Sequence, residues 1–158
     1  MTIRRKREPR FNHAQLLARV SYDPETGIFM SLISNGPALP MGSVVRGYRK
    51  IRIDSQSFQA GRLAWFYVTG TWPAHTIDHK DLNKSNDAFE NLREATQSQN
   101  NANKASRSSI AKGVRRYGKK YQAMFRRKYI GTFDTIEEAS AAYQQAAAFQ
   151  FGKEFVRV

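Results

Sequence analysis

Residues 77–100 read IDHKDLNKSNDAFENLREATQSQN, and their order is the most informative feature of the chain. Two short runs, Ile77–His79 and Leu92–Ala95, are typical of strands, and a polar loop joins them. Thr96 is a preferred N-cap residue, so we expect a helix to begin at Gln97. The segment therefore predicts the order strand, loop, strand, helix.

Three side chains of this segment could converge on one small volume. Asp78 and His79 end the first predicted strand, and Asn100 lies one turn into the helix. Hydrolysis of a phosphodiester needs an activated water and relief of the charge on the phosphate oxygens. A neutral imidazole supplies the base, while a carboxylate and an amide oxygen are hard donors that leave room on Mg²⁺ or Mn²⁺ for water and phosphate. The alternative is that His79 is an ordinary surface histidine.

Composition indicates a polyanionic partner. The chain has 158 residues, with 26 Lys+Arg against 13 Asp+Glu and a net charge of +13. Nucleic acid is the usual partner of such a protein, although an anionic membrane surface would favour the same charge. No cysteine is present, which excludes disulfides, cysteine-ligated zinc and a thiol nucleophile. We see no apolar run long enough for a membrane span and no signal peptide, so we expect a soluble intracellular protein.

The spacing of the 77–100 segment resembles that of the HNH, or ββα-metal, nucleases, in particular the homing endonucleases of phages and mobile introns. That family has an Asp-His pair, an Asn in an Asn-Leu-Arg stretch twelve residues after the His, and a terminal His or Asn nine residues further on. His79, Asn91 and Asn100 lie at these intervals, with Asp78 before the first. The resemblance covers roughly residues 22–103.

This resemblance implies a role for each matching residue. His79 would be the general base, Asp78 and Asn100 would hold one divalent metal ion, Mg²⁺ or Mn²⁺, and Asn91 would hold the first strand and orient His79. It further implies hydrolysis of phosphodiester bonds in double-stranded DNA, by nicking or double-strand cleavage, in the cytoplasm of a bacterial or phage-infected host cell. No membrane and no small-molecule cofactor are expected.

Two positions depart from the family pattern. Gly61 stands where the family usually has the His of His-Arg-Leu-Ala-Trp, and Asn86-Asp87-Ala88 replaces Asp-Asn-Arg. We expect both changes to affect local loop structure and DNA contacts without touching the predicted base or metal ligands. The alternative function is a non-catalytic, sequence-specific DNA-binding regulator with a degenerate nuclease fold, and the intact base and ligands argue against it.

The last third of the chain is the more basic part. From Lys104 to Phe133 there are ten basic residues and no acidic one, and a small, polar, linker-like stretch precedes them. We therefore expect a domain junction near residues 104–110. The alternative is one continuous domain with a basic face.

A three-stranded meander followed by one helix is predicted for this third. The β-prone runs are Gly113–Tyr117, Tyr121–Arg127 and Tyr129–Phe133. After them Thr135 opens a Thr-x-x-Glu capping box, and apolar residues recur at helical spacing up to Gly152. One amphipathic helix would therefore pack on one sheet.

This third is similar to the apetala/ethylene-response-factor DNA-binding domain, found in plant transcription factors and fused to HNH nucleases in phages. The resemblance covers about residues 108–152, and its most specific part is Gly131-Thr132-Phe133-Asp134-Thr135. It implies a set of DNA-facing basic and aromatic side chains, namely Lys112, Arg115, Arg116, Arg126, Arg127 and Tyr129. The alternative is a solvated basic sheet without a ligand.

Together these patterns predict an α+β protein of three parts. Residues 1–21 would form a basic N-terminal arm and a short helix. Residues 22–104 would form an HNH nuclease domain, in which a small N-terminal sheet precedes the ββα-metal motif. Residues 105–158 would form the apetala/ethylene-response-factor-like domain, a three-stranded antiparallel sheet packed on one α-helix.

Overall fold

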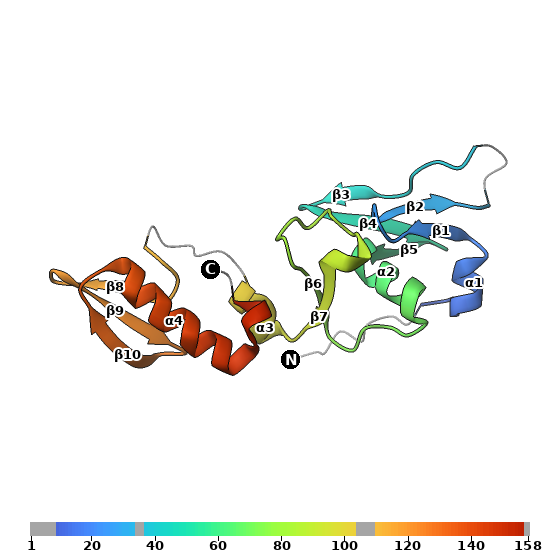
Figure 1. Cartoon of the computed structure of the whole chain (residues 1–158). Helices are drawn as coiled ribbons and strands as arrows, with labels where there is room; N and C mark the ends of the chain where they lie inside the picture. Colours follow the sequence, from blue (N-terminus) through green and yellow to red (C-terminus); the bar gives the residue numbers. More distant parts are fainter. Residues whose placement is uncertain (1–8, 34–36, 104–109, 157–158) are drawn as a thin grey trace. The chain divides into compact units, whose positions relative to one another are not determined.

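The chain is an α+β protein of small antiparallel sheets and short helices, as predicted. Its computed structural model describes residues 9–33, 37–103 and 110–156. The chain divides into two compact units, Met1–Glu94 and Ala95–Val158, and each is described on its own (Figure 1). The predicted basic arm and most of the predicted linker lie outside the described residues.

The first unit contains most of the strands. Its elements, up to the strand that crosses into the second unit, are α1 (His13–Leu17), β1 (Val20–Asp23), β2 (Ile28–Ser31), β3 (Ser43–Val45), β4 (Tyr48–Ile53), β5 (Gln56–Gln59), α2 (Ala60–Thr69), β6 (Thr76–His79), the 3₁₀ turn η1 (Phe89–Asn91) and β7 (Leu92–Ala95). One two-stranded sheet pairs β1 with β2. A three-stranded antiparallel sheet has the order β3-β4-β5, and a second two-stranded sheet pairs β6 with β7. The two strands predicted around the polar loop are therefore present as β6 and β7.

The short helix predicted within residues 1–21 is present as α1. It ends at Leu17, because Val20 already begins β1 and is buried. Tyr22 lies inside β1, where its ring packs on Phe29 with a centroid distance of 4.6 Å. The turn that follows β1 ends at Gly27, whose φ of 72° suits glycine.

The core of the first unit forms around α2. Leu63, Ala64 and Phe66 are buried on this helix and join the same apolar cluster as Ile51 of β4. Gly70, with a φ of 72°, closes the helix as a glycine C-cap. This packing fixes α2 behind the strands that carry the candidate site.

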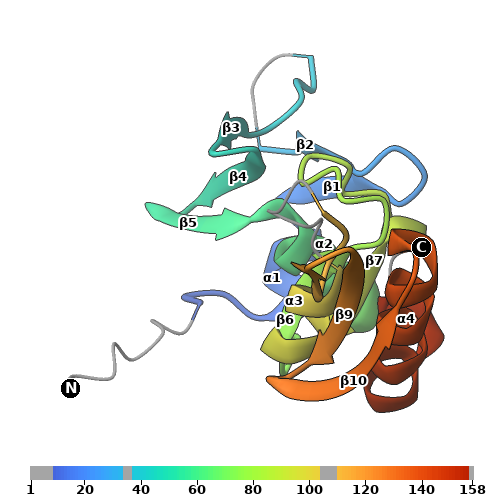
Figure 2. The ribbon, with the colours of Figure 1, turned by 90° about the vertical axis from the view of Figure 1, so that its left-hand side faces the viewer.

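The second unit contains the predicted meander and helix. Its elements are α3 (Gln97–Asn103), β8 (Val114–Tyr117), β9 (Lys120–Phe125), β10 (Lys128–Phe133), α4 (Ile136–Phe151) and the 3₁₀ turn η2 (Lys153–Phe155). The antiparallel sheet has the order β10-β9-β8, and α4 lies along one of its faces (Figure 1 and Figure 2). Thr135 and Glu138 form the predicted capping box of α4.

Small side chains let α4 approach the sheet closely. Ala139 of the helix is buried against Val114 and Ala123, which are partners in register on β8 and β9. Since successive side chains of a strand point to opposite faces, their neighbours Arg115 and Gln122 lie on the face away from α4. We call this the open face of the sheet.

α3 belongs to the second unit by its contacts. The Lys112 ammonium donates to the backbone carbonyls of Asn101 and Ala102 at 2.6 and 2.7 Å, and the Gln99 amide donates to the carbonyl of Phe151 at 3.5 Å. The division between the units therefore precedes α3, whereas the predicted boundary follows it.

The turn between β9 and β10 has an unfavourable backbone. Arg126 and Arg127 have φ angles of 50° and 66°, the left-handed conformation that both central residues of a type I′ hairpin turn adopt. Asn-Gly is preferred there, because a left-handed residue with a Cβ is disfavoured by about 1–2 kcal/mol. The sequence thus places two arginines where local stability favours other residues.

Candidate active site

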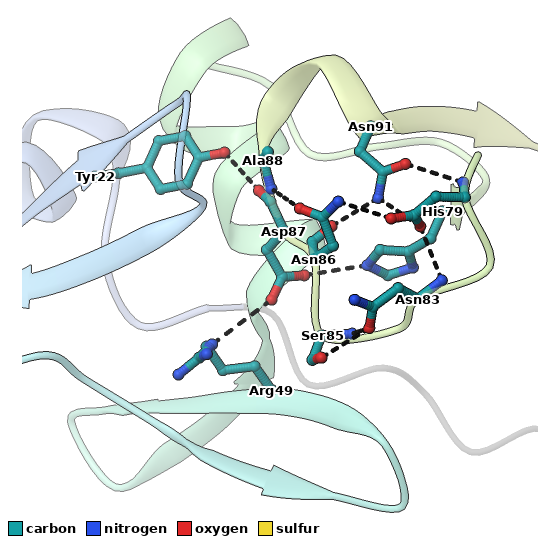
Figure 3. Close-up of polar contacts among 10 residues, drawn as sticks. Tyr22, Arg49, His79, Asn83, Ser85, Asn86, Asp87, Ala88 and Asn91 are labelled. Carbon is teal, nitrogen blue, oxygen red and sulfur yellow. Dashed lines mark hydrogen bonds and ion pairs between the residues drawn. The ribbon is translucent and has the colours of Figure 1, made fainter.

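His79 ends β6 with a buried side chain, only 7% exposed. Its Nε2 atom lies 3.2 Å from Oδ1 of Asp87 (Figure 3). The Tyr48 ring lies near it, with a centroid distance of 6.1 Å to the imidazole. A buried ring with a carboxylate partner is not an ordinary surface histidine, so that alternative is wrong.

Asp78, the residue before it, is also buried and has a strong partner on the paired strand. Its Oδ2 accepts hydrogen bonds from Nε and Nη2 of Arg93 at 3.0 and 2.8 Å. This charge-assisted fork connects β6 to β7 and fixes the direction of the carboxylate.

Asn91 fastens the polar loop between β6 and β7 (Figure 3). Its Oδ1 accepts from the backbone amide of Asp81 at 3.0 Å, and its Nδ2 donates to Oδ1 of Asp81 at 2.9 Å and to the carbonyl of Asn86 at 2.8 Å. Its own carbonyl accepts from the amide of Lys80 at 2.9 Å. These contacts tie the residues directly after His79 to the start of β7.

Asp81 lies at the centre of this loop network. Partial burial alone would raise the pKa of its carboxyl, but hydrogen bonds from Asn86, Asn83 and Asn91, together with the charge of His79, hold that pKa below its ordinary value. Because the charged form is favoured in the folded state, this contribution to stability is present above the ordinary pKa of an aspartate. It is lost as the pH falls through the lowered value.

Asp87 is the site residue that the sequence analysis missed. Its side chain is 2% exposed, with Oδ1 beside His79 and Oδ2 3.9 Å from Nε of Arg49. The Tyr22 hydroxyl donates to its backbone carbonyl at 2.7 Å. Burial, with the charges of Asp87 and Asp23, raises the pKa of that hydroxyl, which therefore stays protonated as the donor.

The expectation that the two departures from the family pattern leave the base untouched is wrong. Asp87 belongs to the Asn86-Asp87-Ala88 departure and contacts the imidazole of His79 directly. Gly61, the other departure, lies on α2, where an added Cβ would stand 3.2 Å from Oδ1 of Asp87. In the sequence Asp87 is one of two aspartates in an amide-rich loop, and only the fold identifies His79 as its partner.

The two predicted metal ligands come from different units. Asp78 lies in the first and Asn100 on α3 in the second, and Thr96 caps that helix by accepting from the amide of Gln99 at 3.3 Å. Among the described residues no group of three or more His, Cys, Asp or Glu side chains could hold a metal ion. One carboxylate and one amide suit only a hard cation that keeps most of its positions for water and phosphate.

Two of the predicted DNA-facing residues occupy the open face of the second unit. Arg115 lies in register with Gln122 and donates to its Oε1 through Nε and Nη2 at 3.0 and 2.7 Å. Tyr129 is 61% exposed, and its hydroxyl lies 2.9 Å from that of Thr132, the partner of Gln122 on β10. These side chains form one polar and aromatic surface.

The other four predicted residues lie elsewhere. Arg116 is in register with Tyr121, which packs against the α4 side, and its Nε donates to the carbonyl of Gly118 at 3.2 Å. Arg126 and Arg127 form the hairpin turn, while Lys112 caps the end of α3. The six residues thus do not share one face.

Comparison with protein families gives a match to the site itself. Residues 59–102 match a family model described as HNH endonuclease. This segment is similar to HNH endonucleases. It contains β6, β7, α2 and most of α3, and with them every residue of the predicted base and metal site as well as Asp87.

One solved structure, described as "DNA binding and cleavage by the HNH homing endonuclease I-HmuI", is similar with 28% sequence identity and a TM-score of 0.43. The match covers 55% of this chain and 52% of that chain, so the similarity extends over about half of each. No curated protein matches the sequence. In the part of the chain that the structure describes, no helix is long and apolar enough to cross a membrane.

Replacing Asn91 tests the loop network. Asn91→Ala removes a donor to the Asp81 carboxylate and leaves the carbonyl of Asn86 without its partner. We expect the pKa of Asp81 to rise and the free energy of unfolding to fall by about 1–3 kcal/mol. Carboxyl ¹³C NMR titration and urea denaturation measure the two effects.

Asn83→Ala is the matched control, because Asn83 binds Asp81 through its backbone amide. It should leave the pKa of Asp81 unchanged. An unchanged pKa in Asn91→Ala would contradict the network as the cause of the lowered value.

Proposed function

We propose that the chain is a metal-dependent DNA endonuclease of the HNH homing type, with His79 as the general base. The observation that carries this proposal is the buried His79 imidazole, held by a carboxylate inside the segment that matches HNH endonucleases. Burial and the carboxylate contact restrict the orientation of the ring, and a general base must be held within hydrogen-bond reach of the water that it activates.

In this proposal the chain's own groups divide the work. The imidazole of His79 takes a proton from the attacking water, and Asp78 and Asn100 are the proposed ligands of one Mg²⁺ or Mn²⁺ ion. Such an ion supplies charge stabilisation for the phosphate oxygens and the leaving 3′ oxygen. Arg93 holds the Asp78 carboxylate in place, and Asn91 holds the loop that follows the base.

The second unit is proposed to hold the duplex. Its open face presents Arg115 and Tyr129, and Arg126 and Arg127 project from the hairpin turn, a combination suited to phosphates and base edges. We propose these four residues as the DNA contacts. Lys112 and Arg116 support them from the α3 cap and from the edge of the sheet.

Plasmid nicking tests the nuclease proposal. With Mg²⁺ or Mn²⁺, the wild-type protein should nick supercoiled DNA from its own genomic neighbourhood, and EDTA should abolish the reaction. His79→Ala should lower the rate by roughly 10²–10⁴-fold, the usual contribution of general-base catalysis. Gel electrophoresis of nicked and linear products gives the rates.

His75→Ala is the control, because His75 lies in the loop before β6, outside the proposed machinery. It should keep wild-type activity. Plasmid that stays intact at high protein concentration with Mn²⁺ would contradict the nuclease and favour a DNA-binding regulator.

The hairpin turn of the second unit gives a separate test of DNA binding. The double variant R126N/R127G removes two charges and relieves the left-handed strain. We expect its free energy of unfolding to rise by about 1–2 kcal/mol. Its affinity for duplex DNA should fall, and the slope of log K against log salt should weaken by about 2, since each phosphate contact contributes about 0.9.

Urea denaturation and fluorescence anisotropy at several salt concentrations measure these effects. R126K/R127K keeps both the charges and the strained backbone, so it should match the wild type in stability and in salt slope. A salt slope that does not change in R126N/R127G would reject the turn as a phosphate contact.

A further inference from the structure

We infer that Asp87 is a positioning residue for His79, holding the imidazole in the tautomer that is protonated at Nε2. The free lone pair of the neutral ring then lies on Nδ1, and in this inference Nδ1 is the atom that accepts the proton from water. This inference rests on the proposed role of His79 as general base, and it adds the group that selects the reactive nitrogen.

The chemistry of the contact sets the tautomer. An ionised carboxylate only accepts hydrogen bonds, so the 3.2 Å contact between Oδ1 of Asp87 and Nε2 of His79 requires a proton on Nε2. The two side chains are 2% and 7% exposed, so bulk water does not compete for either atom. A neutral imidazole carries one proton, and fixing it on Nε2 fixes the lone pair on Nδ1.

Arg49 faces the other oxygen of the Asp87 carboxylate. Oδ2 of Asp87 and Nε of Arg49 are the buried side-chain polar atoms, among the described residues, that have no hydrogen-bond partner, and they face each other at 3.9 Å. A buried carboxylate without a nearby opposite charge is costly. The carboxylate therefore lies between a cation on one oxygen and the imidazole on the other (Figure 3).

Gly61 leaves the room that this arrangement needs. An added Cβ would stand 3.2 Å from Oδ1 of Asp87, the oxygen that contacts His79, and 3.4 Å from side-chain carbons of Ile77 and Leu92. Those two residues belong to β6 and β7, so the carboxylate has packed side chains behind it. The absence of a side chain at position 61 therefore leaves the space in which the Asp87 carboxylate lies.

The backbone of Asp87 is fixed independently of its carboxylate. The Tyr22 hydroxyl, buried on β1, donates to the Asp87 carbonyl at 2.7 Å. Replacing only the carboxylate therefore leaves this anchor in place. Asp87→Asn, which has the same shape, is the sharpest variant because it removes the charge and offers His79 either a donor or an acceptor.

The test reads the tautomer by ¹⁵N NMR of histidine-labelled protein. The chain has three histidines, so each ring can be assigned by its own alanine variant. In the neutral form of the ring, wild-type His79 should carry its proton on Nε2. In Asp87→Asn the population protonated on Nδ1 should rise, kcat for nicking should fall on the order of 10²-fold, and Kd for DNA in EDTA should not change.

Asp54→Asn is the matched control, since Asp54 also pairs with an arginine, Arg19, in the first unit. It should leave the His79 signals and kcat unchanged. Gly61→Ala keeps the charge of Asp87 but crowds Oδ1, so it should shift the tautomer in the same direction as Asp87→Asn. If circular dichroism finds Asp87→Asn unfolded, Gly61→Ala replaces it as the test variant.

Wild-type His79 protonated on Nδ1, or a lower kcat in Asp87→Asn with an unchanged tautomer, would overturn the inference. Failure of the proposed function is a different result: the wild-type protein would carry the Nε2 proton and respond to Asp87→Asn, yet cleave no DNA with either metal. The NMR signal and the cleavage rate therefore separate the two claims.

Discussion

A buried carboxylate must find a partner for its charge, and this requirement organises the first unit. Asp87 meets it with His79 from β6 on one oxygen and Arg49 from β4 on the other, while Tyr22 from β1 holds its backbone. The absence of a side chain at Gly61 on α2 lets the carboxylate reach that position. Elements far apart in the sequence therefore converge on one charged group, and the candidate base owes its orientation to it.

A different constraint governs the second unit. Strand side chains alternate between two faces, and α4 covers the face of Val114 and Ala123, so neighbouring basic residues cannot all point toward the same ligand. Arg115 occupies the open face, whereas Arg116 does not. The strained Arg126-Arg127 turn adds charge at the tip of the hairpin, where it costs local stability. Which basic side chains can face one ligand therefore depends on the geometry of the sheet as much as on the number of basic residues.

Local signals explain what the sequence could predict. The cap at Thr96 and the capping box at Thr135 each act within a few residues, and the structure contains both. Asp87 escaped prediction because its contacts are not local; Tyr22, for example, lies 65 residues before it. The spacing of the motif located His79, but a spacing has no information about which carboxylate faces the ring. That depends on how β1, β4 and α2 pack.

Chemical rescue is the most direct test of His79 as the base. His79→Gly would leave a space beside the Asp87 carboxylate, which could receive imidazole from solution. The account predicts that the variant alone nicks plasmid DNA roughly 10²–10⁴-fold more slowly than the wild type, and that added imidazole raises metal-dependent nicking in proportion to its concentration. A folded variant that nicks at the wild-type rate without imidazole, or whose rate imidazole at any concentration fails to raise, would contradict it.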